Sequence, residues 1–333
     1  MSIPSGPYAA LKIPDFRLFI SARFCVTLAI QIQAVVVAWQ VYEITKDPLS
    51  LGLIGLAEAI PSVGVALYAG HVADSIQRKR IIVVCLATLV LCSLALLSFT
   101  VDIGTSLLTY GVTPIYTVIF ISGIARGFLT PAIFSYMPQL VPREIYSNAV
   151  TWNSTLWETA TIGGPALGGF LYAFLGITAA YVTDVLLMFS GLMLAIGIVT
   201  KELPEKTEEQ GVIEKIRSGL RFVFGNPIIL GAISLDLFAV LFGGAVALLP
   251  IFANEILGVG KQGLGVLRSA PSVGALLMAF YITHHPIMRN SGKILLSCVA
   301  GFGVCMILFA LSTSFWLSLF LLVLSGMFDC ISV

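Results

Sequence analysis

The sequence has little charge for its length. Asp, Glu, Lys and Arg make up only 11% of its 333 residues, whereas a soluble domain carries about 25%. Hydrophobic residues account for 58%, and the mean hydropathy is +1.00. Such a chain has more apolar surface than a water-soluble fold can bury, so we predict an all-α polytopic membrane protein. The net charge of +1 gives no reason to expect a nucleic-acid partner.

Several motifs of catalysis and energy coupling are also missing. The sequence has no C-x-x-C pair, no H-E-x-x-H, no G-x-S-x-G and no G-x-x-x-x-G-K-[ST]. We therefore expect neither an enzyme nor an ATP-driven pump, and no metal or cofactor. All six cysteines lie in apolar runs and are interpreted as packing residues, with a metal or redox role as the alternative: Cys25, Cys85, Cys92, Cys298, Cys305 and Cys330.

Long apolar runs fill most of the chain. A bilayer core of ~30 Å needs about 20 helical residues. Residues 1–14 lack the apolar core and cleavage site of a signal peptide, so the first run is expected to remain as a membrane helix. Ten spans are predicted, at residues 17–42, 51–70, 80–100, 112–131, 148–173, 177–199, 227–252, 263–283, 293–312 and 315–333.

The basic residues are distributed unevenly between the two sides of these spans. Of the 18 Lys and Arg residues, 13 fall on the side of the N-terminus, and only Lys46 and Lys261 fall in loops on the other side. Arg23, Arg126 and Arg268 lie within spans. By the positive-inside rule, the N-terminus is predicted to be cytoplasmic. Trp39 and Tyr42 are then interpreted as anchors at the outer membrane interface.

The longest polar segment, residues 201–226, divides the spans into six and four. Its first part is rich in Glu, and residues 213–223 show the apolar periodicity of an amphipathic helix on the inner membrane face. We therefore predict an N-terminal six-helix bundle at 1–200, a cytoplasmic linker at 201–226, and an incomplete C-terminal bundle of four spans at 227–333.

An internal repeat supports this division. Gly55 and the run Pro61–Gly64 recur as Gly265 and the run Pro271–Gly274, and Ser122-Gly123 recurs as Ser325-Gly326. Span two then corresponds to span eight, and span four to span ten, as in a six-helix unit duplicated in parallel. A complete second unit needs two further spans. We therefore expect the chain to be part of a twelve-span protein; the alternative is a true ten-span protein.

A short charged turn is predicted between spans two and three, from Gly70 to Arg80. It is similar to the Gly-x-x-x-Asp-Arg-x-Gly-Arg-Arg signature of the major facilitator superfamily, although Ser75 and Gln77 depart from that signature. The resemblance implies the major facilitator fold and a gating loop in which Asp74 helps to hold the gate shut. The alternative role of the cations is to anchor the topology. The residues concerned are Gly70, Asp74, Arg78, Lys79 and Arg80.

Span five carries a glycine-rich motif that resembles one found in the export members of that superfamily. Small residues let helices approach closely, and a proline weakens the helix locally, which would suit a moving interface. Plain small-residue packing is the alternative. The motif residues are Gly163, Gly164, Pro165, Gly168 and Gly169. The stretch from Leu235 to Pro271 resembles the branch that contains the enterobactin exporter and macrolide-efflux proteins.

Ionisable residues within spans are costly and are therefore functional candidates. We hypothesise that one or more of Glu58, Glu158 and Asp236 takes up a proton as substrate leaves, since low dielectric favours a neutral carboxyl group. Fixed ion pairs are the alternative. Glu58 and Arg268 occupy equivalent repeat positions, which suggests an outer gate or a proton-sensitive pair. Further candidates are Arg126 and Asp329 near the repeated Ser-Gly, and Gln31 and Gln33 as cavity donors. Arg23 is interpreted as reaching the inner interface, and Asp184 as equally suited to a structural bond.

These features together predict a secondary active transporter in a bacterial inner membrane. The resemblance favours proton-coupled export of a small amphiphilic molecule, such as a drug or siderophore, by alternating access. Its partners would be that small molecule, protons and the lipid bilayer, and we expect a monomer. The alternatives are an importer of a small metabolite, and a fragment or scaffold that does not transport.

Overall fold

The computed structural model describes residues 6, 8–101, 111–199, 221, 223–242, 248–284 and 291–332. Those residues form helices and connecting turns, with no strand among them. The main elements are α1 (Pro14–Thr45), α2 (Pro48–Ser75), α3 (Arg78–Ser98), α5 (Thr113–Leu140), α6 (Tyr146–Gly197), α8 (Pro227–Phe242), α9 (Leu249–Ile251), a π-helical turn (Phe252–Ile256), α10 (Gly260–His284), α11 (Ser291–Leu311) and α12 (Phe315–Ser332).

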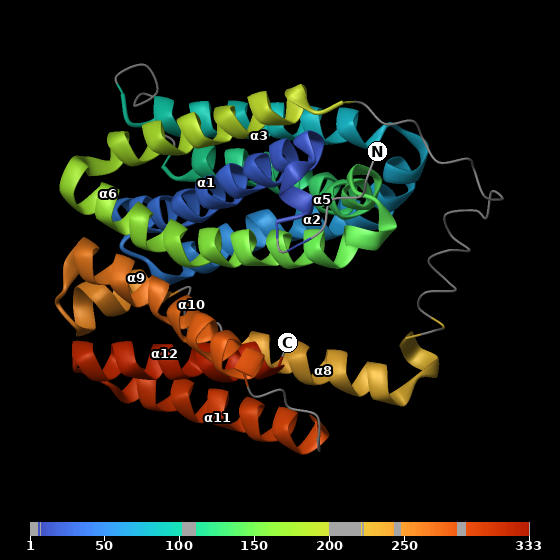
Figure 1. Ribbon diagram of the computed structural model, residues 1–333. Coiled ribbons are helices and arrows are strands. Elements are labelled where there is room, and N and C mark those ends of the chain that lie inside the picture. Colours follow the sequence, from blue (N-terminus) through green and yellow to red (C-terminus); the bar gives the residue numbers. More distant parts are fainter. Residues whose placement is uncertain are drawn as a thin grey trace.

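The helices lie in two groups (Figure 1). We call α1, α2, α3, α5 and α6 the first helix set, and α8 to α12 the second helix set. Six described segments are long and apolar enough to cross a membrane: Pro14–Thr45, Pro48–Ala66, Arg78–Ser98, Thr113–Leu140, Arg143–Gly197 and Ile294–Leu311. The predicted amphipathic helix at 213–223 lies almost wholly outside the described residues.

Local sequence explains where the first helices begin and end. Pro14 is the first residue of α1, where a proline costs no hydrogen bond. Asp15 lies in the first turn, where the helix dipole stabilises a carboxylate. Lys46 ends the helix in the left-handed conformation, at φ 52°. Asp47 then caps α2 by accepting a hydrogen bond from the backbone N–H of Leu49 at 3.1 Å. The reversal between α1 and α2 therefore needs only a few residues.

The predicted spans at 148–173 and 177–199 form one bent element. α6 runs for 52 residues, and its backbone departs from helical geometry at Gly176, where φ is 85° and ψ is 172°. Only glycine adopts this conformation without strain. The sequence thus places the break correctly, but the two legs meet without an intervening loop.

The short charged turn predicted at 70–80 contains only two residues outside the helices. Helix α2 continues through Ser75 and α3 begins at Arg78, so only Ile76 and Gln77 connect them. Gly70 and Asp74 therefore lie on α2, and the three cations open α3. Most of the predicted turn is thus helical, because polar residues at a helix end do not by themselves stop the helix.

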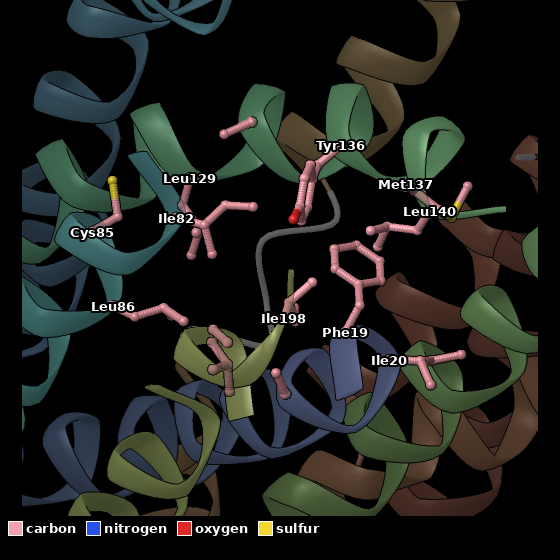
Figure 2. Close-up of a cluster of buried hydrophobic side chains, with 14 of the residues drawn as sticks. Phe19, Ile20, Ile82, Cys85, Leu86, Leu129, Tyr136, Met137, Leu140 and Ile198 are labelled. Carbon is pink, nitrogen blue, oxygen red and sulfur yellow. The ribbon is translucent and has the colours of Figure 1, made fainter. Parts of the chain in front are cut away.

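Two apolar cores hold the helices together. The first lies within the first helix set and is lined from α1, α3, α5 and the end of α6. Figure 2 shows Phe19 and Tyr136 at its centre, with ring centroids 6.1 Å apart in an edge-on arrangement. The second core joins the two sets, since Tyr172 and Tyr181 share it with Leu249 and Leu267.

The internal repeat appears as the same packing in both sets. A methyl group on Gly123 of α5 would lie 2.9 Å from Cγ of Pro61 in α2. In the second set, a methyl group on Gly326 of α12 would overlap the backbone of Pro271 in α10. The repeated Ser-Gly and Pro-Ser-Val-Gly segments thus meet each other twice, where small residues allow close approach.

Candidate functional site

A cavity of about 300 Å³ lies within the first helix set. It runs along the N-terminal half of α1 and the C-terminal half of α5, toward the end of the molecule where α1 begins. Most of its lining is apolar or aromatic, with Thr27, Gln31 and Thr130 as neutral polar side chains. Arg23 and Arg126 are its charged lining residues. Gln31, a predicted cavity donor, is among the lining residues.

A second cavity, of about 200 Å³, lies toward the other end of α1. It is lined by Gln33 of α1, Glu58 of α2, Arg126 of α5 and Arg268 of α10, among apolar neighbours. Arg126 lines both cavities and therefore stands between them. Glu58 and Arg268 share this cavity, as their repeat symmetry suggested, but the ion pair that forms there is a different one.

Glu58 is paired with Arg126. The guanidinium Nη1 donates to Glu58 Oε1, and its Nη2 donates to Gln33 Oε1 at 3.0 Å. The Arg126 side chain is 16% exposed and that of Glu58 is 38% exposed. The pair is held by α2 and α5, whose close approach at Gly123 fixes the distance between them. Three predicted residues thus form one polar chain.

The polar chain continues from Gln33 into a fully buried carboxylate. Gln33 Nε2 donates to Asp184 Oδ2 at 3.3 Å and to Ser93 Oγ at 3.4 Å. Asp184 is 0% exposed, and its Oδ1 has no hydrogen-bond partner among the described residues. Four elements, α1, α3, α5 and α6, meet at Gln33. Sequence reasoning left Asp184 undecided and missed Ser93; three glutamines in α1 were the signal that this helix faces polar groups.

The two helix sets touch near the C-terminal end of α1. The Tyr42 hydroxyl donates to Glu255 Oε1 in the π-helical turn. Within the first set, the Tyr172 hydroxyl donates to Glu43 Oε2 at 2.6 Å. Trp39 and Tyr42 are both buried. The expectation that they anchor the lipid interface was therefore wrong, because aromatic residues at a helix end serve equally well in a contact between helices.

The glycine-rich motif lies on the packed face of α6. Gly164 and Gly168 approach α1 at Gln31 and Ile32, and Gly169 meets Gly265 of α10. Gly163, in contrast, has open space where a side chain would extend. Pro165 is buried within the helix. This motif thus contacts both helix sets.

The cations after α2 make different contacts. Lys79 Nζ donates to the backbone carbonyls of Ile196, at 2.8 Å, and Ile198, which end α6. A cation is favourable at a helix C-terminus. Arg80 is exposed, and Arg78 has a buried Nε without a partner among the described residues. The side chains of Asp74 and Asp236 lie outside the described part of the chain, so their predicted roles stay predictions.

Glu158 of α6 and Asp329 of α12, in different helix sets, lie close enough for their charges to interact. Both were predicted candidates, but their juxtaposition could not be predicted from one sequence. Their like charges repel each other. Arg23 was interpreted as reaching the membrane interface. It instead donates from Nη1 to Asn153 Oδ1 at 2.6 Å.

Comparison with solved structures defines the class of protein. The POT-family transporter PepTSo covers 98% of this chain with a TM-score of 0.71 at 11% identity, and the chain covers 82% of it. A bacterial homologue of the iron transporter ferroportin, in an inward-facing state, covers 96% with a TM-score of 0.68 at 16% identity, with 82% of that chain matched. The fold is that of the major facilitator transporters.

The family follows from the sequence. The model of the transmembrane secretion effector family matches residues 5–331, and the chain belongs to this family of major facilitator proteins, which are transporters and not enzymes. The enterobactin exporter EntS of Shigella dysenteriae is 24% identical over 96% of this chain and 75% of its own length. The staphyloferrin A transporter of Staphylococcus aureus is 23% identical over 78% of this chain and 65% of its own length. The chain spans half to three quarters of the length of these and similar curated relatives.

Proposed function

We propose that this chain forms most of a secondary active exporter that moves a small amphiphilic molecule by alternating access. Residues 1–200 and 227–333 would be the two moving units, joined by 201–226. The observation that carries the proposal is the position of the contacts. The two helix sets meet near the C-terminal end of α1, while the larger cavity lies toward its N-terminal end.

The direction of transport depends on the orientation in the membrane. The excess of Lys and Arg on the side of the N-terminus supports a cytoplasmic N-terminus in a bacterial inner membrane. In that orientation the larger cavity lies toward the cytoplasm, where an exporter loads its substrate. The relatives named as an enterobactin exporter and a staphyloferrin A transporter support a siderophore-like cargo.

Proton coupling would use carboxylates within the spans. Glu58 is the best-placed candidate because its only described ion pair is with Arg126, and protonation would break that pair. Glu158 is a second candidate because it interacts with Asp329 of the other helix set. A proton on either side of this contact would lower the repulsion between the sets and favour their approach.

The test is accumulation in an efflux-deficient bacterium that expresses the 333-residue chain. The panel holds enterobactin, staphyloferrin A, a macrolide and a cationic dye, each measured with and without a protonophore. We expect one compound to accumulate less in expressing cells and the protonophore to abolish this difference. Glu58→Gln should also abolish it, whereas Glu144→Gln, at an exposed site outside the predicted spans, should not. Higher accumulation in expressing cells would contradict export, and efflux that survives the protonophore would contradict proton coupling.

A further inference from the structure

Arg23 is a cation inside a membrane-spanning helix, and no carboxylate among the described residues pairs with it. It lies on α1 and lines the larger cavity. Its guanidinium donates to the neutral amide of Asn153, and its Cζ lies 5.5 Å from the centroid of the Phe134 ring. Within the described ranges, the one Lys or Arg that forms an ion pair is Arg126, with Glu58. Arg23 is thus oriented by two uncharged groups and neutralised by none.

The charges that line the larger cavity do not balance. Arg126 also lines it, but its charge is compensated by Glu58, which lines the other cavity. No Asp or Glu is among the described residues that line the larger cavity. Among the described lining residues, one positive charge is therefore uncompensated. Because an unpaired charge is costly in a medium of low dielectric, a ligand that supplies a negative charge gains from entering.

Aromatic side chains surround this charge. Phe134 is 58% exposed and Trp157 is 42% exposed, and both line the same cavity. Exposed aromatic residues beside the half-buried Arg23 present a flat apolar surface next to a charge-assisted hydrogen-bond donor. The volume of about 300 Å³ is at the lower end of that of small-molecule pockets. The chemistry suits a compact aromatic or apolar group that carries an anionic head.

We propose that Arg23 is the anion-recognition residue of the larger cavity, and that the substrate is an amphiphile with a carboxylate, sulfonate or comparable acidic group. Neutral and cationic amphiphiles of the same size are rejected because they leave the guanidinium unpaired. That this ligand is a transported substrate rests on the proposed function. Its test is a binding measurement, which does not require transport.

The experiment uses naphthalene-1-sulfonate and its neutral analogue naphthalene-1-sulfonamide. Equilibrium dialysis measures their binding to the 333-residue chain in phosphatidylcholine nanodiscs, with empty nanodiscs as background. We expect the sulfonate to bind at least roughly tenfold more tightly than the sulfonamide, as is typical for loss of a charge-assisted hydrogen bond in a buried site. Arg23→Gln should remove this preference, and Arg23→Lys should retain most of it. Arg143→Gln, the same change at an exposed site, should leave it intact.

Three results would overturn the inference: equal binding of the two probes, a preference that survives Arg23→Gln, or no binding of the sulfonate above background. Displacement of the sulfonate by phosphatidylglycerol in the nanodisc would assign Arg23 to a lipid headgroup and would also overturn it. The proposed function fails separately. Sulfonate binding that depends on Arg23, in a chain that shows no efflux, would contradict export and leave the anion site standing.

Discussion

At the residue scale, Arg126 connects most of the polar groups within the first helix set. It pairs with Glu58, donates to Gln33 and lines both cavities. Removal of one member of a buried ion pair costs more than removal of both, since the remaining charge loses its partner. Here that cost is reduced, because the Glu58 side chain is 38% exposed and water screens it.

We therefore expect Arg126→Gln to lower the free energy of unfolding by about 1–3 kcal/mol, less than the loss of a fully buried pair. The double variant Glu58→Gln with Arg126→Gln should recover roughly 1 kcal/mol of this loss. Thermal unfolding of the purified chain in detergent measures both, and Arg143→Gln serves as the control. Additive effects of the two substitutions would show that the ion pair contributes no coupling energy.

The sequence could flag these charges but could not pair them. Glu58, Arg126 and Arg268 each stand out in an apolar span, and the repeat favoured Glu58 with Arg268. The actual partner was decided by the close packing of α2 on α5 at Gly123, which depends on the three-dimensional fold. Asp184 was harder still, because one of its hydrogen bonds comes from Gln33, 151 positions earlier in the chain.

At the scale of elements, α6 determines how closely the helix sets can approach. A methyl group on Gly169 would overlap the backbone of Gly265 in α10, whereas one on Gly163 of the same motif meets nothing. Helix periodicity and small residues predicted a packed interface in this stretch. The rotation of α6 about its own axis decides which glycine faces which helix, and the sequence alone does not give that rotation.

Gly169→Ala should consequently push α6 away from α10 and destabilise the closed contact by about 1–3 kcal/mol, the usual cost of overpacking. The readout is the rate at which a cysteine placed at Arg268 reacts with a membrane-impermeant thiol reagent from the side on which α1 ends, in a chain freed of its native cysteines. Gly163→Ala is the matched control and should leave the rate unchanged. Equal rates in the two variants would contradict the packing role of Gly169.

Gly176 makes the two legs of α6 a single bent element. The outward leg carries the contact with α10 at Gly169, and the return leg carries Asp184. Because no loop separates them, a displacement of one leg is transmitted to the other. The spans predicted at 148–173 and 177–199 placed a break between these legs, but a loop there would have left them independent.

At the scale of the whole molecule, a hydrogen bond between Tyr42 and Glu255 joins the two helix sets. It lies at one end of the molecule, so in the proposed alternating-access cycle it would stabilise one of the two states. A hydrogen bond to a carboxylate contributes about 1 kcal/mol or more. The hydrogen bond of Tyr172 with Glu43 lies within the first set, so it should not affect the equilibrium between the two proposed states.

Tyr42→Phe should accordingly raise the population of the state that is open at this end by about fivefold, which corresponds to about 1 kcal/mol. Double electron–electron resonance between spin labels at Leu49 and Ile256 measures this population, because both side chains are exposed near the contact. Tyr172→Phe provides the control. Unchanged distance distributions in Tyr42→Phe would refute the role of this bond in closure.

The sharing of Arg126 by two cavities has an electrical consequence. Water that enters both cavities would bring the two bulk solutions close to the same guanidinium, so the insulating layer is thinner there than the ~30 Å of the bilayer core. The transmembrane voltage then falls mainly across the layer occupied by Arg126 and Glu58. One elementary charge that crosses this short layer exchanges about 2.3 kcal/mol per 100 mV with the membrane potential. A proton that moves only a few ångströms past this ion pair would therefore use most of the voltage that the cell maintains.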